Sequence, residues 1–354
     1  MSLTDSATDI RQGEELNIQA VETYLKDTIP GLTGNLEVKQ YPSGFSNLTY
    51  LIEIGTKKLV LRRPPFGTKA KTAHDMGREF KILSSIREYF PYCPKPLVYT
   101  EDESILGAPF YVMERIEGII LRKNLPKTLS FSADDAKTLC TNLIDVLLEL
   151  HAIDYKKIGL DNLGKPEGYI NRQVAGWSKR YRAARTQDAP DFESIMTWLE
   201  KNQPADSKNP SLIHNDYKFD NVVLDPENPL KIIGVLDWEM ATIGDPLMDL
   251  GATIAYWINR DDSEEMQLIR MLPTNIEGAL TRKEIISYYL ERSGVSVQDF
   301  TFYQCCNVFR VATIAQQIYY RFYHGQTNDT RFGMFIGAVQ VMERSINSIL
   351  EKNG

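Results

Sequence analysis

The chain has few of the residues that mark disulfide-rich, zinc-binding or membrane-spanning proteins. Its longest apolar stretch, near Ala252 to Ile258, is far too short to cross a bilayer. Adjacent Cys305 and Cys306 lie in a helical apolar pattern, which favours buried core thiols over redox chemistry. Neither a CxxC motif nor Cys/His ligand spacing occurs among the four cysteines, which are Cys93, Cys140, Cys305 and Cys306.

An excess of basic charge is lacking as well. The 354 residues include 40 Lys and Arg against 47 Asp and Glu, which gives a formal net charge of -7 and a pI of about 5.4. This balance argues against a general nucleic-acid binder, because such a protein needs a basic footprint. The first residues are polar and acidic, without an apolar signal core, so we expect a cytoplasmic protein that does not insert into a membrane.

The segment from His214 to Asp237 carries the strongest signal of chemistry. Short apolar strands are predicted over 210–213, 221–224 and 232–236, and the turn formers of 225–229 join the last two into a hairpin. A carboxylate at Asp216 can accept a proton from a hydroxyl, and Asn221 and Asp237 can hold Mg²⁺ against ATP phosphates. Each of these residues alone could simply be a polar turn residue without a catalytic role. The HxDxxxxN pattern, the hairpin and the strand-terminal Asp together predict metal-assisted phosphoryl transfer.

This segment, with Asp237-Trp238-Glu239 and Gly244-Asp245-Pro246 after it, resembles the aminoglycoside phosphotransferase family within the wider protein-kinase-like fold. The resemblance covers nearly the whole chain. The runs 60–65, 214–217 and 236–239 are most similar to the kinase-like branch fused to acyl-CoA dehydrogenases. The resemblance implies an α+β, bilobal fold. A β-rich N-lobe with one main helix would span 1–113, a hinge 114–118, and a mainly helical C-lobe 119–354.

Apolar periodicity predicts elements that agree with this architecture. Ser132 is expected to cap the helix that follows it, with acidic residues in its first turn. Strands are predicted over 36–41, 48–54, 58–62, 97–100 and 110–113. Helices are predicted over 17–26, 73–89, 133–151, 172–185, 192–201, 245–259, 282–293, 300–323 and 335–352.

The resemblance implies ATP and Mg²⁺ as cofactors and places a phosphate-covering loop between the first two strands. Gly44 lets this loop turn tightly, and Ser46 and Asn47 can face phosphate oxygens. The backbone groups of Glu114 and Ile116 are expected to bind the adenine edge. A preference for ATP over GTP cannot be read from these residues.

Arg62 stands where the fold usually has a strand lysine, and Glu79 on the next helix matches its ion-pair partner. An arginine stays charged and can bind phosphate bidentately, so the role can survive the exchange. Because strand residues alternate between faces, Arg62 is expected to face inward and Arg63 to face solvent. The opposite assignment of the two arginines stays open.

The matching family positions imply distinct catalytic roles. Asp216 would be the catalytic base or would orient the acceptor hydroxyl, and Asn221 and Asp237 would bind the metal. His214 and Asp245 would support the catalytic loop, although Asp245 could equally act as a helix N-cap. Two further candidates are Glu239, as a polar neighbour of the metal site, and Lys218, as a contact for the γ-phosphate.

The acceptor, a small molecule, is less readable. Arg172, Lys179 and Arg182 fall near one face of a predicted helix, where they could attract an anion or form an ordinary solvated surface. They are grouped with Glu239 as candidate acceptor-site residues, and the acyl-CoA dehydrogenase branch points toward a hydroxyacyl-CoA. Two alternatives are a nucleotide-binding scaffold without turnover and a protein kinase. The intact set Asp216, Asn221 and Asp237 disfavours the first, and the short stretch after Asp237 leaves little room for a protein kinase's activation loop. The oligomeric state stays open.

Overall fold

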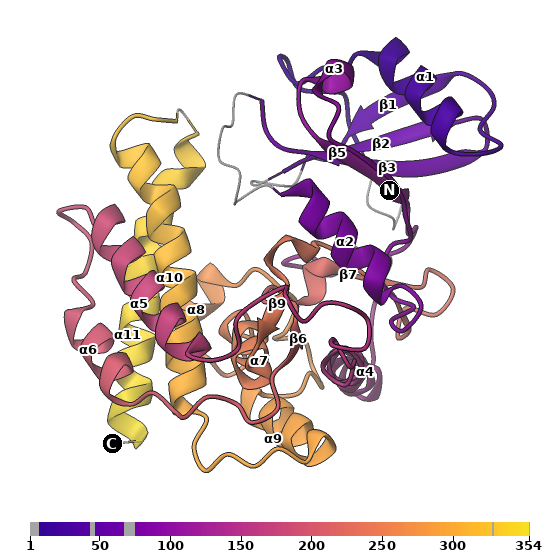
Figure 1. The fold of residues 1–354 in the computed structure, drawn as a ribbon. Helices are drawn as coiled ribbons and strands as arrows, with labels where there is room; N and C mark the ends of the chain where they lie inside the picture. Colours follow the sequence, from indigo (N-terminus) through magenta and orange to yellow (C-terminus); the bar gives the residue numbers. More distant parts are fainter. Residues whose placement is uncertain (1–6, 43–46, 67–74, 328, 354) are drawn as a thin grey trace. The chain divides into compact units, whose positions relative to one another are not determined.

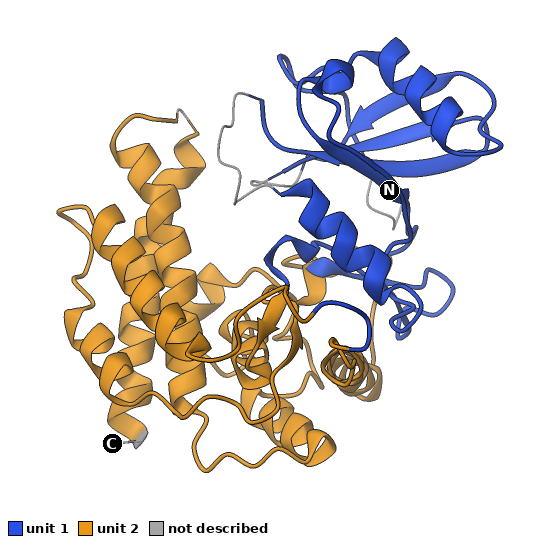
Figure 2. Ribbon diagram, in the orientation of Figure 1, with its two compact units in different colours: residues 1–120, 157–160, 221–241 blue, residues 121–156, 161–220, 242–354 orange. Residues whose placement is uncertain are grey.

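The computed structural model describes residues 7–42, 47–66, 75–327 and 329–353. The chain forms two compact units, coloured separately in Figure 2. Unit 1 comprises residues 1–120, 157–160 and 221–241, and unit 2 comprises residues 121–156, 161–220 and 242–354. The predicted catalytic hairpin therefore packs with the strand-rich part of the chain, whereas the loop that precedes it belongs to unit 2.

Unit 1 is built on an antiparallel five-stranded sheet with the order β1-β2-β3-β5-β4. Its core lies between one face of the sheet and helix α1 (Ile18–Thr28), which buries Val21 and Leu25 (Figure 1). The other face receives α2 (Met76–Ile86), where Phe80 contacts the ring of Tyr111. The strands are β1 (Leu36–Gln40), β2 (Leu48–Ile54), β3 (Lys57–Arg63), β4 (Pro96–Thr100) and β5 (Phe110–Glu114), and a short helix α3 spans Glu103–Leu106.

The prediction that Arg63 faces solvent is wrong. Strand β3 is central in the sheet and is covered on both faces, so Arg62 and Arg63 are only 7% and 2% exposed. The Arg63 guanidinium donates to the carbonyls of Pro64 at 3.1 Å and Leu106 at 3.0 Å, and it lies 3.7 Å from the ring centroid of Phe66. Alternation along the strand holds, but the face that Arg63 occupies is an interior one.

The predicted hairpin is confirmed as β7 (Val222–Leu224) paired with β8 (Ile232–Val235). The segment after β5 lies against it, because Ile119 forms a bridge with Leu224. Gly118 permits this approach, since an added Cβ would lie 2.3 Å from the Leu224 carbonyl oxygen. A glycine is therefore required here by packing.

Unit 2 is mainly helical. Helix α4 (Ala133–His151) begins at the predicted cap, where Ser132 and Asp135 form a capping box. Helix α7 (Pro246–Ala255) is buried along its length and packs closely on α10 (Thr301–Tyr323) at Gly251, whose added Cβ would lie 2.8 Å from the Tyr303 carbonyl oxygen. The other helices are α5 (Tyr169–Ala184), α6 (Glu193–Lys201), α8 (Glu264–Ile269), α9 (Arg282–Ser293) and α11 (Phe335–Asn353).

Short elements of unit 2 complete the fold around the catalytic loop. Strand β6 (Ser211–Ile213) pairs antiparallel with β9 (Thr242–Gly244), a strand that the apolar pattern did not predict. The short helices α3 and α8 were also missed, because so few residues carry too little periodicity. The four cysteines are buried and free, which confirms the prediction of core thiols at Cys305 and Cys306. Among the described residues, no helix combines the length and apolar character that a membrane crossing would need.

Candidate active site

A buried ion-pair cluster in unit 1 is centred on Arg62. Its Nη1 lies 2.9 Å from Glu79 Oε1, so the predicted ion pair is present, and both side chains are buried. Its Nη2 lies 3.1 Å from Asp237 Oδ1 and 3.4 Å from Glu239 Oε2. One guanidinium thus contacts three carboxylates.

Burial and charge act against each other in this cluster. Burial alone would lower the pKa of Arg62, but Glu79 and the other nearby acidic groups raise it well above its ordinary value, so the guanidinium stays protonated. Burial raises the pKa of Glu79, and Arg62 opposes that rise. Asn47 belongs to the same cluster, because its Nδ2 donates to Glu239 Oε2 at 2.7 Å. Gly44 and Ser46, the other predicted loop residues, lie outside the described residues.

Helix α2 is fixed to the segment that follows Asp237, where Trp238–Met240 form a 3-10 turn. Arg78 donates to the carbonyls of Glu239 at 3.3 Å and Ala241 at 2.5 Å. The buried Trp238 indole donates to the Val235 carbonyl at 2.9 Å. The same indole also meets the Phe90 ring edge-on at 5.7 Å. Sequence reasoning missed Arg78, because an arginine beside a glutamate on a helix carries no signal of a distant partner.

The hairpin register brings Asn221 and Asp237 to the same end of β7 and β8. Val222 pairs with Val235, and the Leu236 amide donates to the Asn221 carbonyl at 2.8 Å. Asp237 has φ 67°, a left-handed backbone that is strained for a residue with a side chain, and its side chain keeps 37% of its surface exposed. The register thus places Asn221 and the accessible carboxylate of Asp237 at the same end of the hairpin.

These oxygen donors fit Mg²⁺, which prefers carboxylate and carbonyl ligands and is usually completed by substrate phosphates and water. Within the described ranges, no group of three or more His, Cys, Asp or Glu residues is arranged to hold a metal ion by itself. A metal at Asn221 and Asp237 would therefore need ligands from a nucleotide. That requirement suits a phosphoryl-transfer site better than a structural metal site.

The catalytic loop in unit 2 is braced by Asp249 of α7. Its carboxylate accepts the backbone N–H groups of His214 at 2.7 Å and Asn215 at 2.6 Å. His151 Nε2 lies 3.1 Å from the same carboxylate, and its Nδ1 lies 2.7 Å from the Tyr289 hydroxyl. Burial would raise the pKa of Asp249, but the His151 hydrogen bond and nearby positive charge lower it below its ordinary value.

Asp245 does not brace the loop. Its side chain caps α7 by accepting from the Leu247 amide at 2.7 Å, so the loop-supporting contact predicted for Asp245 is made by Asp249. His214 lies within the loop and is fully buried, and its Nδ1 accepts from the Asp216 amide at 3.3 Å. The correction follows from the helix, because Asp249 lies one turn beyond the cap and points at the loop.

Lys218 lies between two carboxylates of the same loop. Its Nζ is 2.6 Å from Asp216 Oδ2 and 3.3 Å from Asp220 Oδ1, and it is buried. Burial would lower the pKa of Lys218, but Asp216 and Asp220 raise it, so the ammonium stays charged beside the candidate base. Asn215, directly before Asp216, has φ 65°, so strained backbone occurs here as it does at Asp237.

The remaining predicted residues have defined surroundings. The Glu114 amide donates to the Lys95 carbonyl at 2.9 Å, whereas within the described residues the Ile116 amide has no protein acceptor. On α5, Arg172 donates to the carbonyls of Lys165 and Glu167. On the same helix, Arg182 pairs with Glu193 at 2.6 Å, and Lys179 is exposed. Two of the three candidate acceptor-site cations are therefore already engaged.

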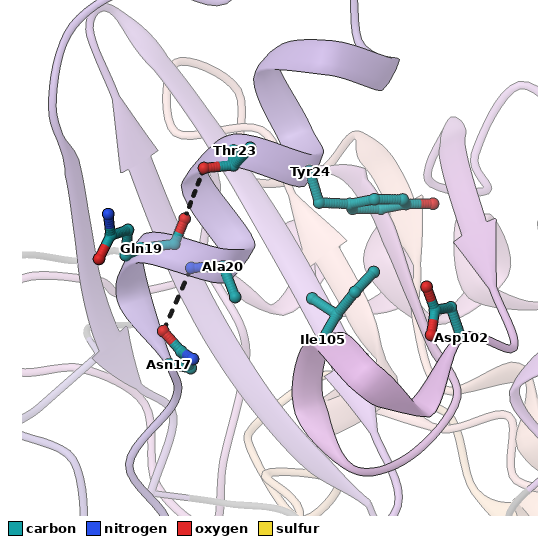
Figure 3. Close-up of a pocket in the computed structure, with 7 residues that line it drawn as sticks. All are labelled: Asn17, Gln19, Ala20, Thr23, Tyr24, Asp102 and Ile105. Atoms are coloured by element: carbon teal, nitrogen blue, oxygen red, sulfur yellow. Dashed lines mark hydrogen bonds between the residues drawn. The ribbon is translucent and has the colours of Figure 1, made fainter.

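A pocket of about 500 Å³ lies in unit 1 between α1 and α3 (Figure 3). Tyr24 and Ile105 form its apolar side, and the cap residues Asn17 and Asp102 form its polar edges. None of the residues predicted to take part in catalysis lines it. It is not the candidate active site.

Together, the strand-rich unit with its buried Arg–Glu pair and the helical unit with its braced HxDxxxxN loop define a phosphotransferase of the protein-kinase-like fold. Residues 37–272 match the family model described as the phosphotransferase enzyme family. The chain belongs to this family.

Known proteins agree with that assignment. Acyl-CoA dehydrogenase family member 11 of Rattus norvegicus is 33% identical over 343 residues, which are 93% of this chain and 42% of that protein. The chain thus spans less than half the length of that relative. A candidate aminoglycoside phosphotransferase from Ralstonia eutropha has a TM-score of 0.80 and 27% identity, covering 96% of this chain and 99% of that one. Choline kinase from Cryptosporidium parvum Iowa II, at 14% identity, shares the fold, with a TM-score of 0.59 and coverage of 93% and 97%. The family and these neighbours support a small-molecule kinase.

Proposed function

We propose that this chain is an ATP-dependent, Mg²⁺-assisted kinase that transfers the γ-phosphoryl group to a hydroxyl of a small molecule. The observation that carries the proposal is the end of the hairpin, where the register brings Asn221 and Asp237 to the same end and Asp237 contacts Arg62. Phosphoryl transfer needs positioning and charge neutralisation more than covalent chemistry from the protein. An amide oxygen, a carboxylate and a guanidinium supply both.

Each group has a role in the proposed reaction. The acceptor oxygen bonds to the γ-phosphorus as the bond to the ADP oxygen breaks, and Asp216 accepts the proton that the hydroxyl releases. Asn221 and Asp237 would hold Mg²⁺, which neutralises phosphate charge when bound. Arg62 binds a phosphate oxygen, and Glu79 keeps its guanidinium in place.

The other groups bind the nucleotide or hold the loop. Asn47, with Gly44 and Ser46, would cover the phosphates, and the backbone of Glu114 and Ile116 would bind the adenine edge. His214, braced through Asp249, keeps the Asp216 loop in place. The predicted boundaries of an N-lobe, a hinge at 114–118 and a C-lobe remain part of this proposal.

The acceptor that we favour is an anionic hydroxyl compound, such as a hydroxyacyl-CoA. The helix α5 carries Arg172, Lys179 and Arg182, whose charge would repel polycationic aminoglycosides. The relatives named for acyl-CoA dehydrogenases support the same direction, although their names describe proteins much longer than this chain.

A metabolite panel incubated with the protein, ATP and Mg²⁺, and read by mass spectrometry, tests the proposal. We expect one class of hydroxyl compound to gain a phosphoryl group, and we expect Asp216→Asn to abolish most of that gain. Nucleotide binding without phosphorylation of any compound would favour the scaffold alternative. Phosphorylation of added proteins, but of no small molecule, would favour a protein kinase.

A further inference from the structure

Unit 2 also buries an arginine, Arg310 on α10, whose surroundings are unlike those of Arg62. It is 8% exposed, and its Nη2 donates to the Asn215 carbonyl at 2.6 Å. Its guanidinium lies 5.6 Å from the ring centroid of Trp177 on α5. In the part of the chain that the structure describes, no carboxylate lies within 4.0 Å of Arg310. Among the described residues, this buried cation therefore has no ion-pair partner.

A second cation meets the same indole. The Arg180 guanidinium lies 4.6 Å from the ring centroid of Trp177, and among the described residues it too has no carboxylate within 4.0 Å. An indole face stabilises a cation only modestly, and two like charges at one ring repel each other. Buried charges in proteins are normally paired, because an unpaired charge loses its hydration without compensation. An arginine cannot escape this cost by deprotonation.

The unpaired charge lies beside the candidate base. Arg310 is bonded to the carbonyl of Asn215, the residue directly before Asp216, and the Tyr169 hydroxyl donates to the Asn215 side chain at 3.1 Å. Burial raises the pKa of Tyr256 to about 12, and both Lys218 and Arg310 oppose the rise, so the field of Arg310 reaches the ring next to Lys218. A group bound at Arg310 would thus lie near the loop that carries Asp216.

We propose that Arg310 and Arg180, whose guanidinium groups both contact the Trp177 ring, bind a carboxylate or phosphate group of the acceptor. This inference rests on the proposed kinase function and names its substrate class as anionic hydroxyl compounds. It also assigns acceptor recognition to Arg310 and Arg180 instead of Arg172 and Arg182. Arg172 already donates to backbone carbonyls, and Arg182 is paired with Glu193. A guanidinium with free donors can bind either anion bidentately.

Calorimetric titration of the full chain with Mg²⁺ and a non-hydrolysable ATP analogue tests this proposal. The probes are sodium 3-hydroxybutanoate, its uncharged amide, and coenzyme A, so that the carboxylate and phosphate sources are separated. We expect the protein to bind at least one anionic probe more tightly than the amide. We expect Arg310→Gln to weaken that binding by about tenfold or more, Arg310→Lys to weaken it less, and the amide to bind unchanged.

Two further variants separate recognition from folding. Arg180→Gln should weaken the anionic probe by about threefold, as loss of a second, more exposed contact does. Arg185→Gln, at the exposed C-cap of α5 and outside the contacts of Trp177, is the matched control and should change nothing. If Arg310→Gln does not fold, Arg310→Lys and Arg180→Gln carry the test.

Three results would overturn the proposal. These are equal binding of the acid, coenzyme A and the amide by the unaltered protein, equal weakening of anion and amide by Arg310→Gln, and an effect of Arg185→Gln as large as that of Arg180→Gln. Failure of the kinase function is recognised separately. In that case anion binding would still depend on Arg310, but no compound of the panel would be phosphorylated.

Discussion

Arg62 of unit 1 and Arg310 of unit 2 are both buried near a candidate functional segment, but their neighbours differ in charge. In unit 1, Arg62 contacts the carboxylates of Glu79, Asp237 and Glu239. In unit 2, Arg310 contacts a carbonyl and an indole. The first arrangement gathers carboxylate oxygens, which are the ligands that suit a cation such as Mg²⁺. The second has positive charge left over and suits an anion.

The same side chain can serve both arrangements because its donors point in fixed directions. A guanidinium can hold several oxygen atoms at once, as Arg62 does, or keep donors available for a ligand. Its charge state does not change with burial, so only the neighbours decide the sign of the site. We therefore expect variants of the Arg62 cluster to weaken the binding of Mg²⁺ and nucleotide, and variants at Arg310 to weaken the binding of anions.

The largest effect should come from Asp237→Ala, which removes an accessible carboxylate from the Arg62 cluster. We expect productive Mg²⁺–ATP binding to be lost, because the triphosphate would lack its charge compensation. Nucleotide affinity is measured with and without Mg²⁺, and anion binding at Arg310 serves as the control. A variant whose Mg²⁺ dependence equals that of the parent protein would remove Asp237 from the metal site.

Asp216→Asn should reduce turnover by about 10²-fold or more, as loss of a positioned base does, while ATP binding stays intact. Lys218 would then lack one of its two carboxylates, but Asp220 still compensates its charge. Turnover on the acceptor found in the panel is compared with nucleotide affinity. Near-normal turnover of this variant would show that Asp216 is not the base.

Replacements at the two neighbouring arginines of β3 separate nucleotide binding from packing. Arg62→Lys should retain substantial activity, since one point charge remains, whereas Arg62→Ala should lose it and destabilise the fold by about 3 kcal/mol because Glu79 is left unpaired. Arg63→Ala removes two hydrogen bonds to carbonyls, so it should lower stability while nucleotide affinity is preserved. Loss of nucleotide binding in Arg63→Ala, but not in Arg62→Ala, would reverse the assignment.

Arg78→Ala should weaken Mg²⁺–ATP binding by about threefold to tenfold, because the segment after Asp237 loses two hydrogen bonds to α2. Arg87→Ala is the matched control. Arg87 lies at the end of the same helix and also donates to two carbonyls, those of Pro91 and Cys93. Equal effects of both variants would mean that Arg78 only stabilises α2.

The smallest effect should appear as a pH dependence of stability. The folded pKa of Asp249 lies below its ordinary 3.8, so its stabilising contribution is present above that value and is lost as the pH falls through the folded pKa. Asp249→Asn should therefore lower the free energy of unfolding at neutral pH by about 2 kcal/mol and flatten the acid limb of the stability curve. Chemical denaturation at several pH values measures both.

Asp245→Asn is the control for that experiment. Burial raises the pKa of Asp245, so its contribution has the opposite sign, and Asn preserves the helix cap. An acid limb flattened equally by both variants would show that Asp249 has no special role in bracing the loop.

The local parts of this protein were predictable from the sequence. The bounds of α4 and α9 were predicted to the residue, and the hairpin of β7 and β8 was predicted from its turn formers. The pairing of Arg62 with Glu79 followed from the family pattern. Helices, caps and tight hairpins depend on neighbours a few residues away, and the sequence displays those neighbours directly.

Only the tertiary structure decided which distant groups meet. It buried Arg63, because β3 became a central strand with both faces covered. It gave the bracing of the catalytic loop to Asp249 rather than Asp245. It joined Arg310 to Trp177 and Asn215. Such contacts link residues far apart in the chain, and the packing of whole elements fixes them, so no short pattern of residues can contain them.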